Sequence, residues 1–142
     1  DLMMSNPALG PTAVDEAVRW EQPAVGLPRV AVEDVEIDGV TIPAGSTVYV
    51  TYAAANRGER VFQDPARFDL ERPDVKKHVT FGFGTHFCMG APLARRELLH
   101  GFREVVRRFD EMWFLPETDL TIAPNYFLRA LKELKIGFRK AD

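Results

Sequence analysis

The single cysteine of this 142-residue chain lies in a segment rich in glycine and aromatic residues, which restricts the possible folds more than any other segment. The segment reads Phe81-Gly-Phe-Gly-Thr-His-Phe-Cys-Met-Gly90. Gly82, Gly84 and Gly90 allow backbone angles that other residues avoid, so the main chain can approach a bound group closely. The phenylalanines and the methionine supply an apolar wall around Cys88. With one thiol, the chain cannot form an internal disulfide.

A long amphipathic helix is predicted directly after this segment, over residues 91–109. Pro92 is compatible with it, because proline is tolerated in the first turn. The free N–H groups at the start of a helix create a positive potential that favours a thiolate at Cys88. A thiolate in a dry pocket, with N–H donors around the sulfur, suits a metal whose redox potential is tuned by the surrounding groups. The apolar stripe of the helix consists of Ala94, Leu98, Phe102, Val105, Val106 and Phe109.

Each of these residues taken singly has a simpler interpretation. A lone cysteine is usually a small buried hydrophobic residue, and a lone histidine such as His86 is more often structural or exposed. A zinc site is not indicated, because the three histidines and one cysteine show no spacing typical of ligands. The ordered combination of glycines, aromatic residues, His86 and Cys88 before a helix is what favours a metal-binding thiol.

The N-terminal third predicts a short helix followed by strands. Thr12 is predicted to cap a helix over residues 13–21, with Asp15 near its positive end, and Pro23 ends it. Valine and isoleucine recur with a period near two through residues 29–52, which predicts β-structure. The turns and the strand expected there are Asp38-Gly39, Pro43–Gly45 and Ser46–Thr51.

The remaining segments carry weaker patterns. Residues 56–80 contain many charges, two prolines and Gly58, with no sustained period. So long an irregular stretch inside a compact domain is unusual and often functional. From Leu120 onward the chain predicts short strands or a hairpin.

The bulk properties exclude some classes of function. The length suits one domain, and the net charge of −3 argues against a nucleic-acid partner. We expect no membrane partner, because no apolar run approaches the ~20 residues that span a bilayer. There is no signal-peptide pattern, and a single thiol fits a reducing, cytoplasmic location. The first residue is Asp1 rather than methionine, which indicates a processed chain or part of a longer one.

The order Phe-x-x-Gly-x-His-x-Cys-x-Gly over residues 81–90 resembles the haem signature of the cytochrome P450 family, and residues 91–97 resemble its bacterial form. The resemblance implies a mainly α fold with small β-sheets (α+β) and haem b (iron protoporphyrin IX) as cofactor. Cys88 would be the axial ligand of the haem iron and the catalytic residue. The other residues that the resemblance assigns to the cofactor are His86, Arg29, Phe81, Gly82, Gly84 and Gly90.

Further motifs extend the resemblance over nearly the whole chain. Glu16-Ala-Val-Arg19 is similar to the Glu-x-x-Arg helix motif of the family, although a solvated ion pair is the simpler interpretation. In the family this pair binds an arginine of the irregular segment, and Arg67 in Pro65–Phe68 is the matching candidate. Three charged groups would then hold a segment that lacks its own hydrogen-bond ladder.

The resemblance also assigns the surroundings of the haem. Arg29 and His86 would donate hydrogen bonds to the haem propionates, a task for which the planar guanidinium is well suited. Arg29 could instead be a surface residue of a strand. The residues that match substrate-pocket segments of the family are Ala24, Val25, Leu27, Phe127 and Leu128, and apolar residues beside turns are otherwise simply core.

The implied activity is that of a monooxygenase, which inserts one oxygen atom of dioxygen into a small organic substrate. Electrons would come from a ferredoxin-type partner, attracted by a basic patch on the thiolate side of the haem. Some of the following side chains should form that patch, although a solvated helix face is the simpler interpretation: Lys76, Lys77, Arg95, Arg96, Arg103, Arg107 and Arg108. A non-catalytic haem-binding or electron-transfer module, or a structural fragment, are the alternatives.

The resemblance covers only the C-terminal part of the family fold, here a single segment over residues 1–142. The central helix that delivers protons to dioxygen in the family lies N-terminal to the Glu-x-x-Arg helix and is not in this sequence. We therefore expect the isolated chain to be inactive, or to need a complementary N-terminal chain, because the apolar stripe of helix 91–109 lacks partners.

Overall fold

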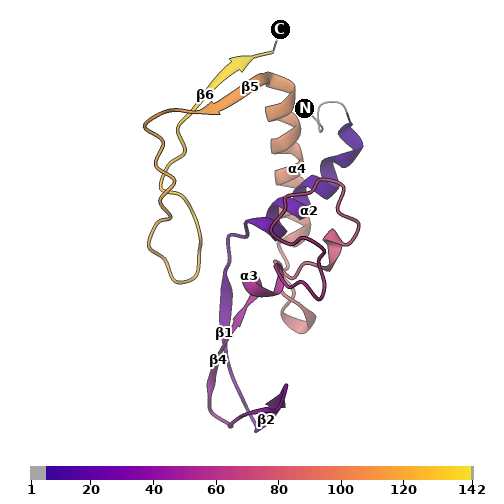
Figure 1. The fold of residues 1–142 in the computed structure, drawn as a ribbon, viewed down its shortest axis with the longest axis vertical. Helices are drawn as coiled ribbons and strands as arrows, with labels where there is room; N and C mark the ends of the chain where they lie inside the picture. The colour runs from indigo at the N-terminus through magenta and orange to yellow at the C-terminus, as the bar shows by residue number, and fades with distance from the viewer. Residues whose placement is uncertain (1–5, 142) are drawn as a thin grey trace.

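The computed structural model describes residues 6–141, and its elements are short helices and strands around one long helix (Figure 1). Helices α2 and α4 lie against each other at the centre, while the ribbons β1–β4 and β5–β6 extend toward opposite ends. This is the α+β class that the sequence predicts. The elements are η1 (Pro7–Leu9), α2 (Gly10–Trp20), β1 (Gly26–Val30), β2 (Val35–Ile37), β3 (Val40–Ile42), β4 (Thr47–Thr51), α3 (Tyr52–Ala55), η2 (Val75–Lys77), η3 (Gly84–His86), α4 (Ala91–Arg108), β5 (Phe109–Phe114) and β6 (Ile136–Lys140).

Helix α2 begins one turn earlier than predicted. Pro11 occupies its first turn, where a missing N–H costs nothing, and Leu9 precedes the helix without a side-chain cap. Thr12 therefore lies inside the helix, and its prediction as the cap is wrong. The end of the helix at Trp20, shortly before Pro23, agrees with the sequence.

The strands of the described residues form three two-stranded antiparallel sheets. The β2–β3 hairpin turns at Asp38 (φ 49°) and Gly39 (φ 78°), and a hairpin turn of this type requires positive φ at both positions. The predicted strand at 46–51 is β4, which pairs with β1. Strand β5 pairs with β6, although the sequence placed the first strands of the tail only after residue 120.

The irregular segment at 56–80 is held on α2 by a buried ion network. Glu16 and Arg19 are 0% and 1% exposed. Arg19 donates to the Glu16 carboxylate from Nε at 2.6 Å and from Nη2 at 2.8 Å. Arg72 donates to the same carboxylate from Nε, at 3.1 Å to each oxygen. The simpler interpretation of a solvated ion pair is therefore wrong, and we call Glu16, Arg19 and Arg72 the Glu16 network.

The third member of this network is not the residue that the sequence indicated. Among the described residues, Arg67 contributes its main-chain carbonyl, which accepts from Arg19 at 3.2 Å and from Arg72 at 2.8 Å, while its side chain lies at the surface. The prediction of Arg67 is corrected to Arg72, which lies five residues further along the same irregular segment. Without regular spacing in the segment, the sequence could not distinguish the two arginines.

The network replaces the hydrogen-bond ladder that residues 56–80 lack. Arg19 Nη1 donates to the carbonyls of Asn56 at 2.8 Å and Pro65 at 2.9 Å. Arg72 Nη1 donates to the carbonyl of Gln63 at 2.6 Å. These buried and partly buried carbonyls therefore find partners in side chains, as polar groups removed from water must.

Glu16 stays ionised in this environment. Burial is the largest influence and opposes ionisation, but hydrogen bonds from Arg19, from the Asp69 N–H and from Arg72 together outweigh it. The pKa of Glu16 therefore lies below its usual value of 4.5. The network is thus a carboxylate shared by two guanidinium groups.

Truncating the two arginines separately tests the corrected assignment. Arg72→Ala should lower the free energy of unfolding by ~3–5 kcal/mol, because it leaves part of a buried charge without its partner. Arg67→Ala should change it by no more than ~0.5 kcal/mol, because the main-chain carbonyl stays in place. Denaturant unfolding of both variants measures this, and equal losses would contradict the assignment to Arg72.

The lowered pKa of Glu16 also predicts a pH dependence. In the unfolded chain the carboxyl protonates near pH 4.5, whereas the folded state resists protonation. The stability from Glu16 is therefore fully present above that pH and is lost as the pH falls through the lower folded pKa. Glu16→Gln removes this titration, so its stability should fall less steeply with acid. Parallel curves of unfolding free energy against pH would contradict the prediction.

Candidate functional site

The cysteine loop borders a hollow of about 360 Å³ beside α2 and α4. The residues that line it come from α2, residues 23–27, α3, the segment 80–88, α4 and residues 127–128, so segments far apart in the sequence meet here. Most of them are apolar. The lining residues are Val18, Pro23, Ala24, Leu27, Tyr52, Thr80, Phe81, Gly82, His86, Cys88, Ala94, Leu98, Phe127 and Leu128.

The backbone of the loop fixes the position of the thiol. The Cys88 N–H donates to the Phe81 carbonyl at 2.8 Å, which closes the loop. Gly82 and Gly84 have φ of 76° and 67°, a region that residues with a side chain rarely adopt. The Ala91 N–H donates to the Cys88 carbonyl at 3.2 Å, so the first turn of α4 follows the thiol directly. The predicted juxtaposition of thiol and helix start is confirmed.

Helix α4 contributes only the first part of its predicted stripe to the hollow. Ala94 and Leu98 line it, one turn apart on the same face. Further along, Phe102, Val105 and Val106 are only half-buried. The stripe therefore exists from Ala94 to Val106, and the described residues cover it incompletely. Phe109, predicted as its last member, instead begins β5.

The two predicted substrate segments lie side by side through backbone pairing. Ala24 and Leu128 form an isolated β-bridge, and the Val25 N–H donates to the Phe127 carbonyl at 3.2 Å. Ala24, Leu27, Phe127 and Leu128 all line the hollow. The resemblance assigned these two segments, about 100 positions apart in the sequence, to one pocket, and in the structure they are neighbours.

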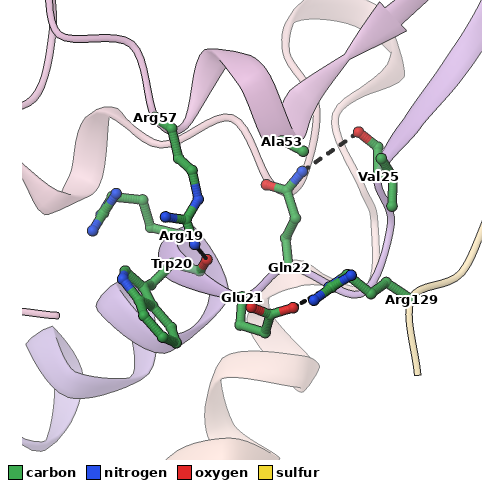
Figure 2. A pocket seen from close by; sticks show the side chains of 8 residues that line it. All are labelled: Arg19, Trp20, Glu21, Gln22, Val25, Ala53, Arg57 and Arg129. Carbon is green, nitrogen blue, oxygen red and sulfur yellow. Dashed lines mark hydrogen bonds and ion pairs between the residues drawn. The ribbon is translucent and has the colours of Figure 1, made fainter. Parts of the chain in front are cut away.

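Val25 is the exception among these residues. It borders a separate polar pocket of about 280 Å³, at the end of α2 (Figure 2). There its carbonyl accepts from Gln22, and Arg57 and Arg129 lie nearby. Val25 therefore does not line the hollow, because neighbouring residues of an extended segment point to opposite sides. Its role in a substrate pocket stays a prediction.

His86 and Arg29 differ in their relation to the hollow. His86 lines it beside Cys88. Arg29 is exposed on β1, and its Nη1 donates to the Pro28 carbonyl at 2.9 Å. Arg29 lies two residues beyond Leu27, so both side chains project from the same face of the strand. Arg29 is not among the residues that line the hollow, and its propionate role stays a prediction.

The metal chemistry of the site depends on a single protein ligand. Among residues 6–141, no three His, Cys, Asp or Glu side chains lie close enough to hold a metal ion together. Cys88 is exposed to the hollow as a free thiol. One thiolate in an apolar hollow suits a metal that brings its other ligands with it, as the porphyrin of haem does. The residues present therefore fit a haem.

Four lining residues were not predicted as part of the site from the sequence: Val18, Pro23, Tyr52 and Thr80. Val18 lies on the buried face of α2, directly before Arg19 of the Glu16 network. Tyr52 begins α3, and Thr80 donates from its hydroxyl to the Val18 carbonyl at 2.8 Å. The position of Thr80 directly before the glycine-rich segment was the only available signal, and Val18 and Tyr52 carried none.

The part of the chain that the structure describes contains no helix long and apolar enough to cross a membrane.

Comparison with known proteins gives consistent matches. The family profile of cytochrome P450 matches residues 7–136. A "Putative cytochrome P450 140" of Mycobacterium tuberculosis is 44% identical over 110 residues, or 78% of this chain. A "Steroid C26-monooxygenase" of the same species is 35% identical over 139 residues, or 97% of this chain.

Solved structures agree with the sequence matches. The substrate-free cytochrome P450 CYP150A6 of Mycobacterium marinum superposes with a TM-score of 0.94 at 34% identity, covering 99% of this chain and 36% of that one. The chain also spans only 25% and 35% of the two curated relatives. The correspondence is therefore close but is limited to about a quarter to a third of each relative.

Proposed function

The chain belongs to the cytochrome P450 family, whose members bind haem b, and we propose that it forms the thiolate side of a haem monooxygenase. The enzyme would insert one oxygen atom of dioxygen into a small organic substrate. The observation that carries the proposal is the hollow in which the only thiol of the chain meets an apolar wall built from six separate segments.

Cys88 would be the axial ligand in this proposal. The haem would supply the iron at which dioxygen reacts, and the thiolate would donate the electron density that favours cleavage of the O–O bond. The residues of this chain would hold the cofactor and exclude water from it. Phe81, Ala94 and Leu98 would form the apolar wall, while His86 in the hollow and Arg29 on β1 would bind the propionates.

The substrate would lie against the side of the hollow made by Ala24, Leu27, Phe127 and Leu128. These four side chains are apolar, so we propose an apolar organic substrate. The curated relatives include a steroid C26-monooxygenase and a mycinamicin IV hydroxylase/epoxidase. A steroid is a mostly apolar molecule, in agreement with this class.

Electrons would arrive from a ferredoxin-type protein on the basic side of the cysteine loop. Lys76 and Lys77 are exposed and directly precede the loop. Arg107 and Arg108 suit the role less well, because both pair with Glu104, at 2.8 and 2.9 Å. They also lie roughly 24 Å along the helix axis from its start, at 1.5 Å per residue. Among the candidate cations, we therefore favour the two lysines with Arg96.

The 142 residues would form only one wall of the haem site. Leu93 and Met89 are 62% and 98% exposed, and within α4 only Ala91 is fully buried. Exposed apolar groups of this size mark surfaces that other segments cover. We propose that turnover needs a further apolar wall from outside these residues, in the same chain or a complementary one. Without that wall, the isolated chain would be a module that binds haem but does not turn over substrate, which is the alternative function.

Replacing the thiol tests the proposed cofactor site. Haem-loaded protein, reduced and exposed to carbon monoxide, should show the absorption band of thiolate ligation. Cys88→Ala should abolish that band, and Cys88→His should retain haem with a changed spectrum. Met89→Leu is the control, because its side chain is adjacent but exposed. A wild-type spectrum for Cys88→Ala would contradict the proposal.

Charge reversal at the loop tests the electron-donor surface. In the enzyme with its electron donor, Lys77→Glu should slow haem reduction about tenfold at low salt. Added salt should shrink the difference, because it screens exposed charges. Lys140→Glu, on β6 at the far end of α4, is the control and should reduce at the wild-type rate. Reduction of Lys77→Glu at that rate at every salt concentration would argue against a docking site at the lysines.

A further inference from the structure

A second network of buried charge lies beside the hollow and contacts the cysteine loop. Asp15 of α2 is 6% exposed, and its Oδ1 accepts a hydrogen bond from Nε of Arg95 on α4 at 2.7 Å. Nε2 of His78 lies 3.3 Å from the same oxygen. These three side chains belong neither to the Glu16 network nor to the lining of the hollow.

The hydrogen bonds determine how this network is oriented. The Thr80 N–H donates to Nδ1 of His78 at 3.2 Å, so the ring proton lies on Nε2 and is donated to Asp15. Nη2 of Arg95 lies 3.4 Å from that Nε2, but both atoms carry protons and cannot bond to each other. Asp15 is therefore the acceptor that holds both the imidazole and the guanidinium.

Arg95 connects this acceptor to the cysteine loop. Its guanidinium carbon lies 4.6 Å from the centre of the Phe81 ring, a distance at which cation and ring attract each other. The ring of His78 lies 5.8 Å from the same ring. The carbonyl of Phe81 in turn accepts from the Cys88 N–H at 2.8 Å. Contacts thus run from Asp15 through Arg95 and Phe81 to the main chain of Cys88.

The loop depends on such support because its own side chains are exposed and pack against little of the described chain. Residues 83–90 are all exposed, and Phe83 is 87% exposed. Phe81 is the point at which the buried part of the chain meets this exposed loop. The orientation of the sulfur therefore depends on how firmly Phe81 is held.

We propose that Arg95 is a positioning residue for the thiol. Anchored by Asp15, it fixes Phe81, and Phe81 fixes the main chain from which the Cys88 sulfur projects. Only the identity of the sulfur as haem ligand rests on the proposed function. The contact by which Arg95 holds the cysteine loop does not require haem, so its effect on the loop is measurable with or without the cofactor.

Hydrogen–deuterium exchange of the loop tests the proposal in the apo and the haem-loaded protein. Arg95→Gln should speed amide exchange in residues 81–90 by about fivefold to thirtyfold, the factor that loss of one such contact gives. Arg103→Gln, an exposed arginine further along α4, is the control and should leave the loop unchanged. Phe81→Leu should reproduce the effect of Arg95→Gln, and the double variant should exchange no faster than the faster single one.

Three results would overturn the proposal. Loop exchange in Arg95→Gln could equal that of Arg103→Gln. The effects of Arg95→Gln and Phe81→Leu could multiply in the double variant, which would mean that Arg95 acts independently of the ring. Exchange could also rise equally in α2 and α4, which would indicate a general structural role. A haem-loaded wild type without the thiolate band would contradict the proposed function, while the exchange data would still decide the role of Arg95.

Discussion

The fold depends on one carboxylate that is completely removed from water. Glu16 is 0% exposed and is shared by Arg19 from its own helix and by Arg72 from the irregular segment. A buried charge is tolerated only where partners compensate its desolvation, so this geometry fixes where residues 56–72 can run. The segment that follows must then pass beside α2, which brings the cysteine loop to the same helix.

Two neighbouring acidic residues of α2, Asp15 and Glu16, hold different segments of the chain. Successive residues of a helix are rotated by about 100°, so Asp15 and Glu16 project from different sides. Glu16 holds the irregular segment, and Asp15 binds Arg95 and His78 next to the loop. The same short helix therefore positions the segment before the thiol and the helix after it, and its Val18 also lines the hollow between them.

Elements that depend on residues within one segment could be predicted from the sequence. The hairpin at Asp38-Gly39, the strand before Tyr52 and the helix after Cys88 all follow from turn residues or periodicity within one segment. The start of α2 was misplaced, because a proline in the first turn competed with a plausible cap at Thr12. Arg72 was missed for a different reason. Its role depends on three-dimensional proximity to Glu16, which residues in an irregular segment do not encode by spacing. The same holds for the Asp15–Arg95 contact, whose partners lie 80 positions apart.

The central claim is that this assembly presents Cys88 to a haem iron as its ligand. Iron-edge X-ray absorption of the haem-loaded wild-type protein reports the atoms bound to the metal directly. The account predicts one sulfur scatterer in addition to the nitrogens of the porphyrin. Because Cys88 is the only cysteine and the exposed Met89 side chain is the only other sulfur in the loop, the same measurement on Met89→Leu should be unchanged. A first shell of nitrogen and oxygen alone, or loss of sulfur in Met89→Leu, would contradict the assignment.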